Sequence, residues 1–314
     1  MSVLLKKASE MDDVVVSQGS LIKDLDMLDT ELRKVLNSKK KGCGVVISGE
    51  AGSGKTTLLR KFVEMAEELL SELCQSPASI VDMETPDKPI GKDLFEAMLD
   101  AAGTPYDDLT ALSKLKESHQ KREIKRLIES KNIRVWIFDE FQHAVKTWGD
   151  KTAEASANFL KLIINNFPVL IIFAGTDEVK SVATKGQYDS RAKFIEKQRM
   201  HIDSATAYQR YLDYLATLQT HNEIDGIAWD SPEIALPVFY ESRGDLRKIT
   251  DTFQTALVHA DKNNARKLAK KHFEESWTSR YQPQQGEDVL FKTNTFRQPL
   301  EKLLDALKID YDVE

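Results

Sequence analysis

The sequence predicts an α/β fold, with a parallel five-stranded sheet and a smaller C-terminal helical domain. Three observations support this prediction. A glycine-rich loop over 49–57 stands between a β-branched run and a helical pattern. Apolar runs then recur up to residue 202 with helical patterns between them, which is typical of a parallel sheet covered by helices. After residue 205 only helical patterns remain.

The predicted strands are short apolar runs separated by longer helical segments. An amphipathic helix precedes the first strand, because one stripe of it consists of leucines: Leu21, Leu25, Leu28, Leu32 and Leu36. The strands follow at 45–48, 79–83, 133–138, 169–174 and, with the weakest pattern, 199–202. The first of them, in Gly44-Val-Val-Ile-Ser48, is a short β-branched run that predicts a buried strand.

The loop over 49–57 fits the phosphate-binding pattern G-x-x-x-x-G-K-[ST]. Its glycines let the backbone turn successive N–H groups toward a polyphosphate, and the following helix adds its positive N-terminal end. Lys55 is expected to contact the β- and γ-phosphates, and Thr56 to ligate Mg²⁺. We therefore predict ATP binding by nine residues: Gly49, Glu50, Ala51, Gly52, Ser53, Gly54, Lys55, Thr56 and Thr57.

A second motif follows the third apolar run. The run over 133–138 carries Asp139 and Glu140 to the carboxyl end of a central strand, beside the phosphate loop. Asp139 is suited to hold the Mg²⁺ shell, and Glu140 to orient and deprotonate the attacking water. The pair predicts an ATPase, an enzyme that hydrolyses ATP to ADP and phosphate.

Two further residues are candidates for the reaction. The fourth run is followed by Thr176, whose hydroxyl is suited to sensing the γ-phosphate or positioning water; the alternative is a turn with a helix N-cap at Thr176 or Asp177. Arg191 is expected to complete a neighbouring subunit's site, as bridging arginines do in phosphoryl transfer. A solvated charge is the alternative, and the rival basic residues nearby are Lys185, Lys193, Lys197 and Arg199.

Composition excludes several other classes. The chain has 314 residues and a formal net charge of −6, so it is not a basic nucleic-acid binder as a whole. Its two cysteines are too few for a disulfide framework or a common zinc site, which favours a reducing, cytoplasmic location. No apolar run has the length of a membrane span, and the N-terminus lacks a signal-peptide pattern. We assign no metal beyond Mg²⁺.

We expect four regions along the chain. They are an N-terminal extension (1–20), the nucleotide-binding core (21–204), a helical domain (205–280) and a tail (281–314). The helical domain has helical patterns at 205–219, 231–242, 245–260 and 265–276. In the tail, a linker-like run precedes a short helix over 300–307. The tail is suited to bind a partner protein, and equally to dock on its own domain.

A basic stretch offers a surface for DNA. Residues 111–134 hold eight basic side chains and three acidic ones, in a chain that is acidic overall. Five apolar residues predict that one side packs while the basic side faces outward: Leu112, Leu115, Ile124, Leu127 and Ile128. Such a face is suited to contact DNA phosphates with strong salt dependence, and a solvated helix is the alternative. The preferred DNA-binding residues are Lys114, Lys116, Lys121 and Arg122.

Taken together, these motifs resemble the AAA+ ATPases, a P-loop fold with a helical lid. The similarity covers residues 20–262 and includes Gly-Asp-Leu-Arg at 244–247, where it implies that Arg247 senses the nucleotide in cis. Within this class the chain is similar to transposition regulators of the TnsC/TniB type, as in CRISPR-associated and related transposons. The stretch 84–105 and the string Phe-Asp-Glu-Phe-Gln-His at 138–143 carry this resemblance. Thr176 departs from the Asn that many AAA+ proteins have at that place.

The resemblance implies an ATP-dependent homo-oligomer, a ring or a helical filament, that assembles on duplex target DNA. Such proteins recruit or activate the transposase and act with a target-selection protein. Two alternatives stay open: a clamp-loader or initiator-like ATPase that handles DNA in another system, and a nucleotide-dependent switch with only protein partners.

Overall fold

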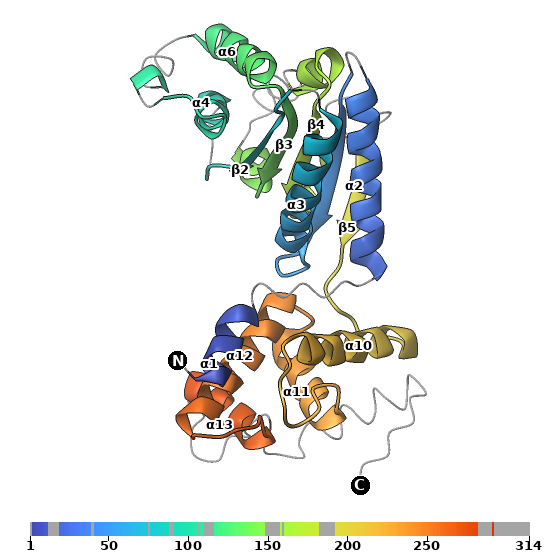
Figure 1. The fold of residues 1–314 in the computed structure, drawn as a ribbon, viewed down its shortest axis with the longest axis vertical. Helices are drawn as coiled ribbons and strands as arrows, with labels where there is room; N and C mark the ends of the chain where they lie inside the picture. Colours follow the sequence, from blue (N-terminus) through green and yellow to red (C-terminus); the bar gives the residue numbers. More distant parts are fainter. Residues whose placement is uncertain are drawn as a thin grey trace. The chain divides into compact units, whose positions relative to one another are not determined.

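The fold is taken from a computed structural model that divides the chain into two compact units (Figure 1). One unit comprises 19–198, and the other combines 1–18 with 199–314. The structure describes residues 2–11, 19–38, 41–74, 76–87, 91–105, 107–109, 116–147, 158, 160–181, 192–281 and 291. Among them, no helix is long and apolar enough to cross a membrane.

The first unit is built on five parallel strands, as the sequence predicts. They are β1 (Cys43–Gly49), β2 (Ser79–Glu84), β3 (Ile133–Asp139), β4 (Leu170–Gly175) and β5 (Ala192–Lys197). Their order in the sheet is β2-β3-β4-β1-β5, with every neighbouring pair parallel. Because all strands run the same way, their carboxyl ends meet at one edge of the sheet. That edge carries the phosphate loop and the residues that follow β3 and β4.

The fifth strand corrects one prediction. The sequence pattern favoured 199–202, whereas the structure forms β5 from Ala192–Lys197. This strand pairs with β1 on one side only, so its side chains are less buried: Ile195 is buried, but Phe194 is 45% exposed. An edge strand with charged residues gives a weaker apolar signal than a central strand does. Lys197 nevertheless fixes β5 to α2 (Gly19–Asn37) through an ion pair of 2.8 Å with Asp24.

Helices cover both faces of the sheet. On one face, α2 contacts α3 (Lys55–Leu73) and the central strands. On the other face, α4 (Gly91–Ala101), α6 (Glu117–Ser130), α7 (Gln142–Thr147) and residues 160–166 pack on an apolar cluster. That cluster includes side chains from β1, β2, β3 and β4, among them Val46, Met83, Phe138 and Phe173.

The second unit consists of helices, in agreement with the loss of strand patterns after residue 205. It contains α10 (Ala205–His221), α11 (Pro232–Ser242), α12 (Leu246–Lys262) and α13 (Lys270–Tyr281). Its core is aromatic: Trp229 stacks on Phe253 with ring centroids 3.9 Å apart, and Phe253 meets Phe273 edge-on at 5.4 Å. Such pairs add to the stabilisation that burial of large rings gives.

The N-terminal helix α1 (Val3–Glu10) also belongs to the second unit. It packs on α12 and buries Leu4, Ala8 and Met11 in the same core. The amide of Gln254 on α12 donates a hydrogen bond of 3.2 Å to the carbonyl of Ala8. Sequence reasoning treated this segment as a separate extension, because a short amphipathic helix does not reveal its partner.

The tail has one described anchor. Phe291 is 2% exposed, and its ring lies 5.4 Å from that of Phe273. At this position the tail docks on its own unit, which is one of the two alternatives the sequence left open. The helix expected over 300–307 lies outside the described residues.

Phe291→Ala should therefore destabilise the second unit by about 3–5 kcal/mol, the usual cost of truncating a fully buried phenylalanine. Urea unfolding followed by circular dichroism measures the change. Val3→Ala is the control, because Val3 is exposed on α1 of the same unit and its loss should cost less than about 0.5 kcal/mol. A Phe291→Ala variant that unfolds like this control would show that Phe291 does not anchor the tail.

Candidate functional site

The phosphate loop connects β1 to α3 and depends on glycines at both ends. A Cβ added to Gly49 would lie 2.2 Å from the carbonyl oxygen of Lys197, so the loop leaves β1 where only glycine fits beside β5. Gly54 precedes α3 with φ of 89°, in the left-handed region that favours glycine. The 19-residue helix α3 begins directly after it at Lys55. Its first-turn N–H groups and dipole therefore face the loop, which is a suitable arrangement for an anion.

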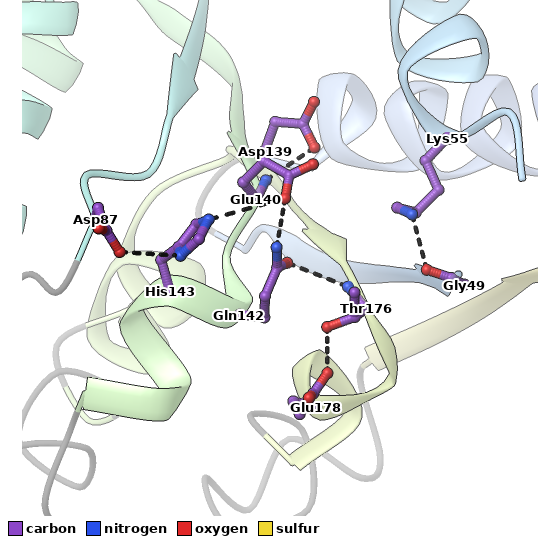
Figure 2. Close-up of polar contacts among 9 residues, drawn as sticks. All are labelled: Gly49, Lys55, Asp87, Asp139, Glu140, Gln142, His143, Thr176 and Glu178. Carbon is purple, nitrogen blue, oxygen red and sulfur yellow. Dashed lines mark hydrogen bonds and ion pairs between the residues drawn. The ribbon is translucent and has the colours of Figure 1, made fainter. Parts of the chain in front are cut away.

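Lys55 places a buried positive charge inside this loop. It is 7% exposed, and its Nζ donates to the carbonyl oxygen of Gly49 at 2.7 Å (Figure 2). The same Nζ donates to the carbonyl oxygen of Glu50 at 2.9 Å. Carbonyl oxygens orient an ammonium group without neutralising it, so the loop keeps a positive potential. Ser53 adds a buried hydroxyl that makes no hydrogen bond among the described residues. A buried ammonium and a buried hydroxyl in a glycine loop fit a polyphosphate ligand.

Asp139 ends β3, with Glu140 in the turn that follows. The Glu140 N–H donates a 2.8 Å hydrogen bond to Oδ1 of Asp139. Burial raises the pKa of the Asp139 carboxyl above its ordinary value. The Glu140 N–H opposes this rise, the charges of Glu140 and Asp82 add to it, and the charge of Lys55 opposes it. A half-buried carboxylate that costs free energy to ionise is suited to a nearby cation, which favours the charged form.

Glu140 adopts a strained backbone conformation. Its φ is 51°, in the left-handed region that residues with a Cβ rarely occupy. Its carboxylate accepts a hydrogen bond from Nε2 of Gln142 and lies 3.9 Å from Nε2 of His143 (Figure 2). The other ring nitrogen of His143 lies 3.4 Å from Asp87, in the segment after β2. Through His143, the contacts of Glu140 therefore extend to the segment after β2.

Thr176 follows β4 and is joined to Glu140 through Gln142. Its N–H donates to Oε1 of Gln142 at 3.1 Å, and its hydroxyl bonds the carboxylate of Glu178 (Figure 2). Thr176 stands at the N-cap of the short 3₁₀ helix η2 (Asp177–Val179), but its side chain makes no capping bond there. The structure thus brings Thr176 to the same edge of the sheet as Lys55, Asp139 and Glu140.

Sequence reasoning missed Gln142 as a site residue. The string Phe-Asp-Glu-Phe-Gln-His carries the family resemblance as a whole, but nothing in the sequence pairs the amide of Gln142 with the end of β4. Only strand order does so, because β4 pairs with β3 along Val135–Phe138.

The arginine candidates are differently placed. Arg191 lies outside the described residues, as does its rival Lys185. Two other rivals have partners of their own: Lys197 pairs with Asp24, and Arg199 lies 3.9 Å from Asp245. Lys193 is exposed on β5.

Arg247 is exposed in the first turn of α12, in the second unit. The carboxylate of Asp245 caps this helix by accepting the N–H groups of Arg247 at 3.0 Å and Lys248 at 3.3 Å.

The basic stretch forms α6 in part. Its buried side is confirmed where it is described: Ile124, Leu127 and Ile128 face the core, while Leu112 and Leu115 lie outside the described residues. Lys116 and Arg122 are exposed, and Lys121 is half-buried with its Nζ 5.1 Å from the ring centroid of Phe95. Lys114 also lies outside the described residues.

Comparison with known proteins identifies the family. The sequence model described as bacterial TniB protein matches residues 15–201, which is more than half of the chain. The chain belongs to the TniB family. A comparison with curated protein sequences found no match. Family membership agrees with the resemblance drawn from the stretch 84–105 and the string Phe-Asp-Glu-Phe-Gln-His at 138–143.

Similar solved structures show the same fold as this TniB family member. The Aeropyrum pernix ORC1 protein, solved in complex with DNA, matches with a TM-score of 0.62 at 15% identity, over 88% of this chain and 68% of that one. Drosophila ORC bound to DNA matches with a TM-score of 0.58 at 12% identity, over 99% of this chain and 80% of that one. Cdc6p from Pyrobaculum aerophilum matches with a TM-score of 0.57 at 16% identity, over 85% of this chain and 68% of that one. These likenesses establish the fold, which is that of the AAA+ ATPases, as predicted.

Asp139→Asn should raise the melting temperature of the nucleotide-free protein at neutral pH, while it weakens stabilisation by ATP with Mg²⁺. Asparagine keeps an oxygen for the Glu140 N–H and removes a charge that burial disfavours. Because the pKa of Asp139 is higher in the folded than in the unfolded protein, the folded protein loses stability as pH rises above the ordinary value of 3.8. The gain should therefore vanish once pH falls below the ordinary value of 3.8.

Differential scanning calorimetry over a pH series measures this gain. Asp203→Asn is the control, because Asp203 is exposed in the second unit. A lower melting temperature for Asp139→Asn than for the wild-type protein at neutral pH would contradict the expected sign.

Proposed function

We propose that this TniB family member is an ATPase that regulates DNA transposition while assembled as a homo-oligomer on duplex DNA. One observation carries the proposal. In a chain of this family, a phosphate loop with a buried lysine lies at the same edge of a parallel sheet as Asp139 and Glu140. In P-loop proteins, these are the groups that bind the phosphates and the metal and activate water.

The loop residues fit ATP and Mg²⁺. The buried ammonium of Lys55 and the buried hydroxyl of Ser53 suit the phosphate chain, and the carboxylate of Asp139 suits a divalent cation. Thr56 lies in the first turn of α3, where its hydroxyl would join Asp139 in holding the cation. When bound, the cation neutralises charge on the phosphate oxygens.

Several side chains would then act during hydrolysis. Glu140 accepts the proton of the attacking water, and Lys55 offsets the charge that builds on the phosphate oxygens. Thr176 orients the water or senses the terminal phosphate. Arg247 responds to the nucleotide within its own chain, and Arg191 completes the site of a neighbouring subunit, where such an arginine contributes about 10³–10⁵ in rate.

DNA is the proposed polymer on which the subunits assemble. Two proteins with this fold, ORC1 of Aeropyrum pernix and Drosophila ORC, were solved with DNA. In this chain, Lys116 and Arg122 are exposed on or next to α6, whose apolar side is buried. The proposed protein partners are the transposase and a target-selection protein, on the basis of family membership.

An initiator-like role in another DNA system is the second candidate, because the similar structures include ORC and Cdc6 proteins. The family match, which covers the nucleotide-binding unit, favours transposition instead.

The first experiment measures the ATPase rate and particle size with and without duplex DNA. We expect hydrolysis that DNA stimulates, and rings or filaments in negative-stain images when ATP and DNA are both present. A protein that hydrolyses ATP but stays monomeric and indifferent to DNA would favour a switch with protein partners only. Absence of hydrolysis under all conditions would overturn the ATPase proposal itself.

Glu140→Gln should keep ATP binding and assembly but stop turnover, because the amide cannot accept the proton of water. The expected loss in kcat is about 10²–10⁴-fold, the usual contribution of a general base. Steady-state phosphate release and ATP-dependent particle formation test the two halves of this expectation. Retained turnover would remove Glu140 from the role of base.

Lys116→Glu combined with Arg122→Glu should weaken DNA binding at least about tenfold and reduce its salt dependence, since each lost phosphate contact lowers the salt slope by about 0.9. The matched control is Arg266→Glu with Lys267→Glu, an exposed basic pair of the second unit. Fluorescence anisotropy over a salt series measures both variants. Equal losses in the two variants would show that charge in general, and not α6, accounts for binding.

A further inference from the structure

The side chain of Gln142 joins two parts of the site. It is 5% exposed at the start of α7. Its Nε2 donates to the carboxylate of Glu140, and its Oε1 accepts the N–H of Thr176 at 3.1 Å (Figure 2). A backbone N–H can only donate, so it selects the oxygen of the amide and turns the nitrogen toward Glu140. The two hydrogen bonds therefore fix each other.

The end of β4 is shaped around this amide. A Cβ added to Gly175 would lie 2.2 Å from Oε1 of Gln142 and 2.5 Å from Cγ2 of Val179. Gly175 pairs with Ser48 of β1, one residue before the phosphate loop begins. Only a residue without a side chain leaves room for Gln142 at this place in the sheet.

Glu140 needs such a restraint. Its side chain is 41% exposed, so packing does not hold the carboxylate in one rotamer. His143 is a weaker restraint, because its Nε2 lies 3.9 Å away and its side chain is 37% exposed. Gln142, in contrast, is buried and is itself held by the backbone of the next strand.

We infer that Gln142 is the positioning residue for Glu140, holding its carboxylate in register with the carboxyl end of β4. This rests on the proposed role of Glu140 as the base. Glu140 takes the proton from water, and Gln142 keeps both of its N–H protons throughout. Through Gln142, the orientation of the Glu140 carboxylate depends on β4. Because β4 pairs with β1, Glu140 and the phosphate loop are positioned by the same pair of strands.

Two substitutions at this position separate the bonds. Gln142→Glu keeps an oxygen for the Thr176 N–H but replaces the donor to Glu140 by a like charge. Gln142→Leu removes both bonds at similar size. We expect kcat to fall at least about tenfold in both, with KM for ATP changed less than about twofold, because misplacing a reacting group affects the transition state more than binding.

The matched control is Gln219→Leu. Gln219 makes the same kind of bonds away from the site: its Oε1 accepts the N–H of Trp229 at 2.9 Å, and its Nε2 donates to the carbonyls of Ile224 and Ile227, each at 3.1 Å. Its loss should lower the melting temperature and leave kcat unchanged. A merely structural glutamine at 142 would behave in the same way.

Gly175→Ala tests the link from the other strand. Its methyl group displaces the Gln142 amide, so kcat should fall as it does in Gln142→Leu. The double variant Gly175→Ala/Gln142→Leu should be no slower than the slower single variant by more than about twofold, because both changes break one link. Additive losses in kcat would overturn the inference.

The outcomes distinguish this inference from the proposed function. If the wild-type protein hydrolyses ATP and Gln142→Glu retains its kcat, the positioning role is wrong while the ATPase stands. If the wild-type protein does not hydrolyse ATP, the positioning role of Gln142 and the ATPase proposal are both wrong. Melting temperatures and ATP affinities accompany each rate, and if Gln142→Leu or Gly175→Ala fails to fold, Gln142→Glu decides alone.

Discussion

The insertion of β4 between β1 and β3 is the interaction on which the candidate site depends. All six residues of β4 are buried, and its ladder joins Ser48 on one side through Gly175 and Phe138 on the other through Phe173. These parallel ladders set the heights of the phosphate loop and of Asp139 relative to each other. The rings of Phe138, Phe141 and Phe173 pack beneath the turn that carries Glu140, with centroids 4.8–5.5 Å apart. The site is therefore a property of the sheet as much as of its own side chains.

Much of this arrangement follows from local sequence. The runs that became β1, β3 and β4 are mostly apolar because both faces of these strands are covered, and the glycine loop has the spacing of a phosphate site. The spacing of Ile124, Leu127 and Ile128 likewise predicts the buried side of α6. In each of these cases the signal comes from residues close together in the chain.

What the sequence did not reveal depends on distant pairing. The sequence pattern placed the fifth strand at 199–202 instead of Ala192–Lys197, because a strand that pairs on one side needs few apolar residues. The partners of Gln142 could not be named without strand order, and the docking of Phe291 on Phe273 could not be separated from partner binding. The strained φ of Glu140 likewise has no signature in a single sequence.

The position of α1 bears on how the protein folds during synthesis. The sheet unit is one continuous stretch, 19–198, and can close its core as soon as that stretch has left the ribosome. The second unit is discontinuous, since Leu4 and Met11 precede the sheet unit in the chain and their partners on α12 follow it. Its core is complete only when these two segments meet, which is a contact of high sequence separation and thus a slow one to form. A nascent chain would therefore carry a folded phosphate loop while the apolar side of α1 still lacks its cover.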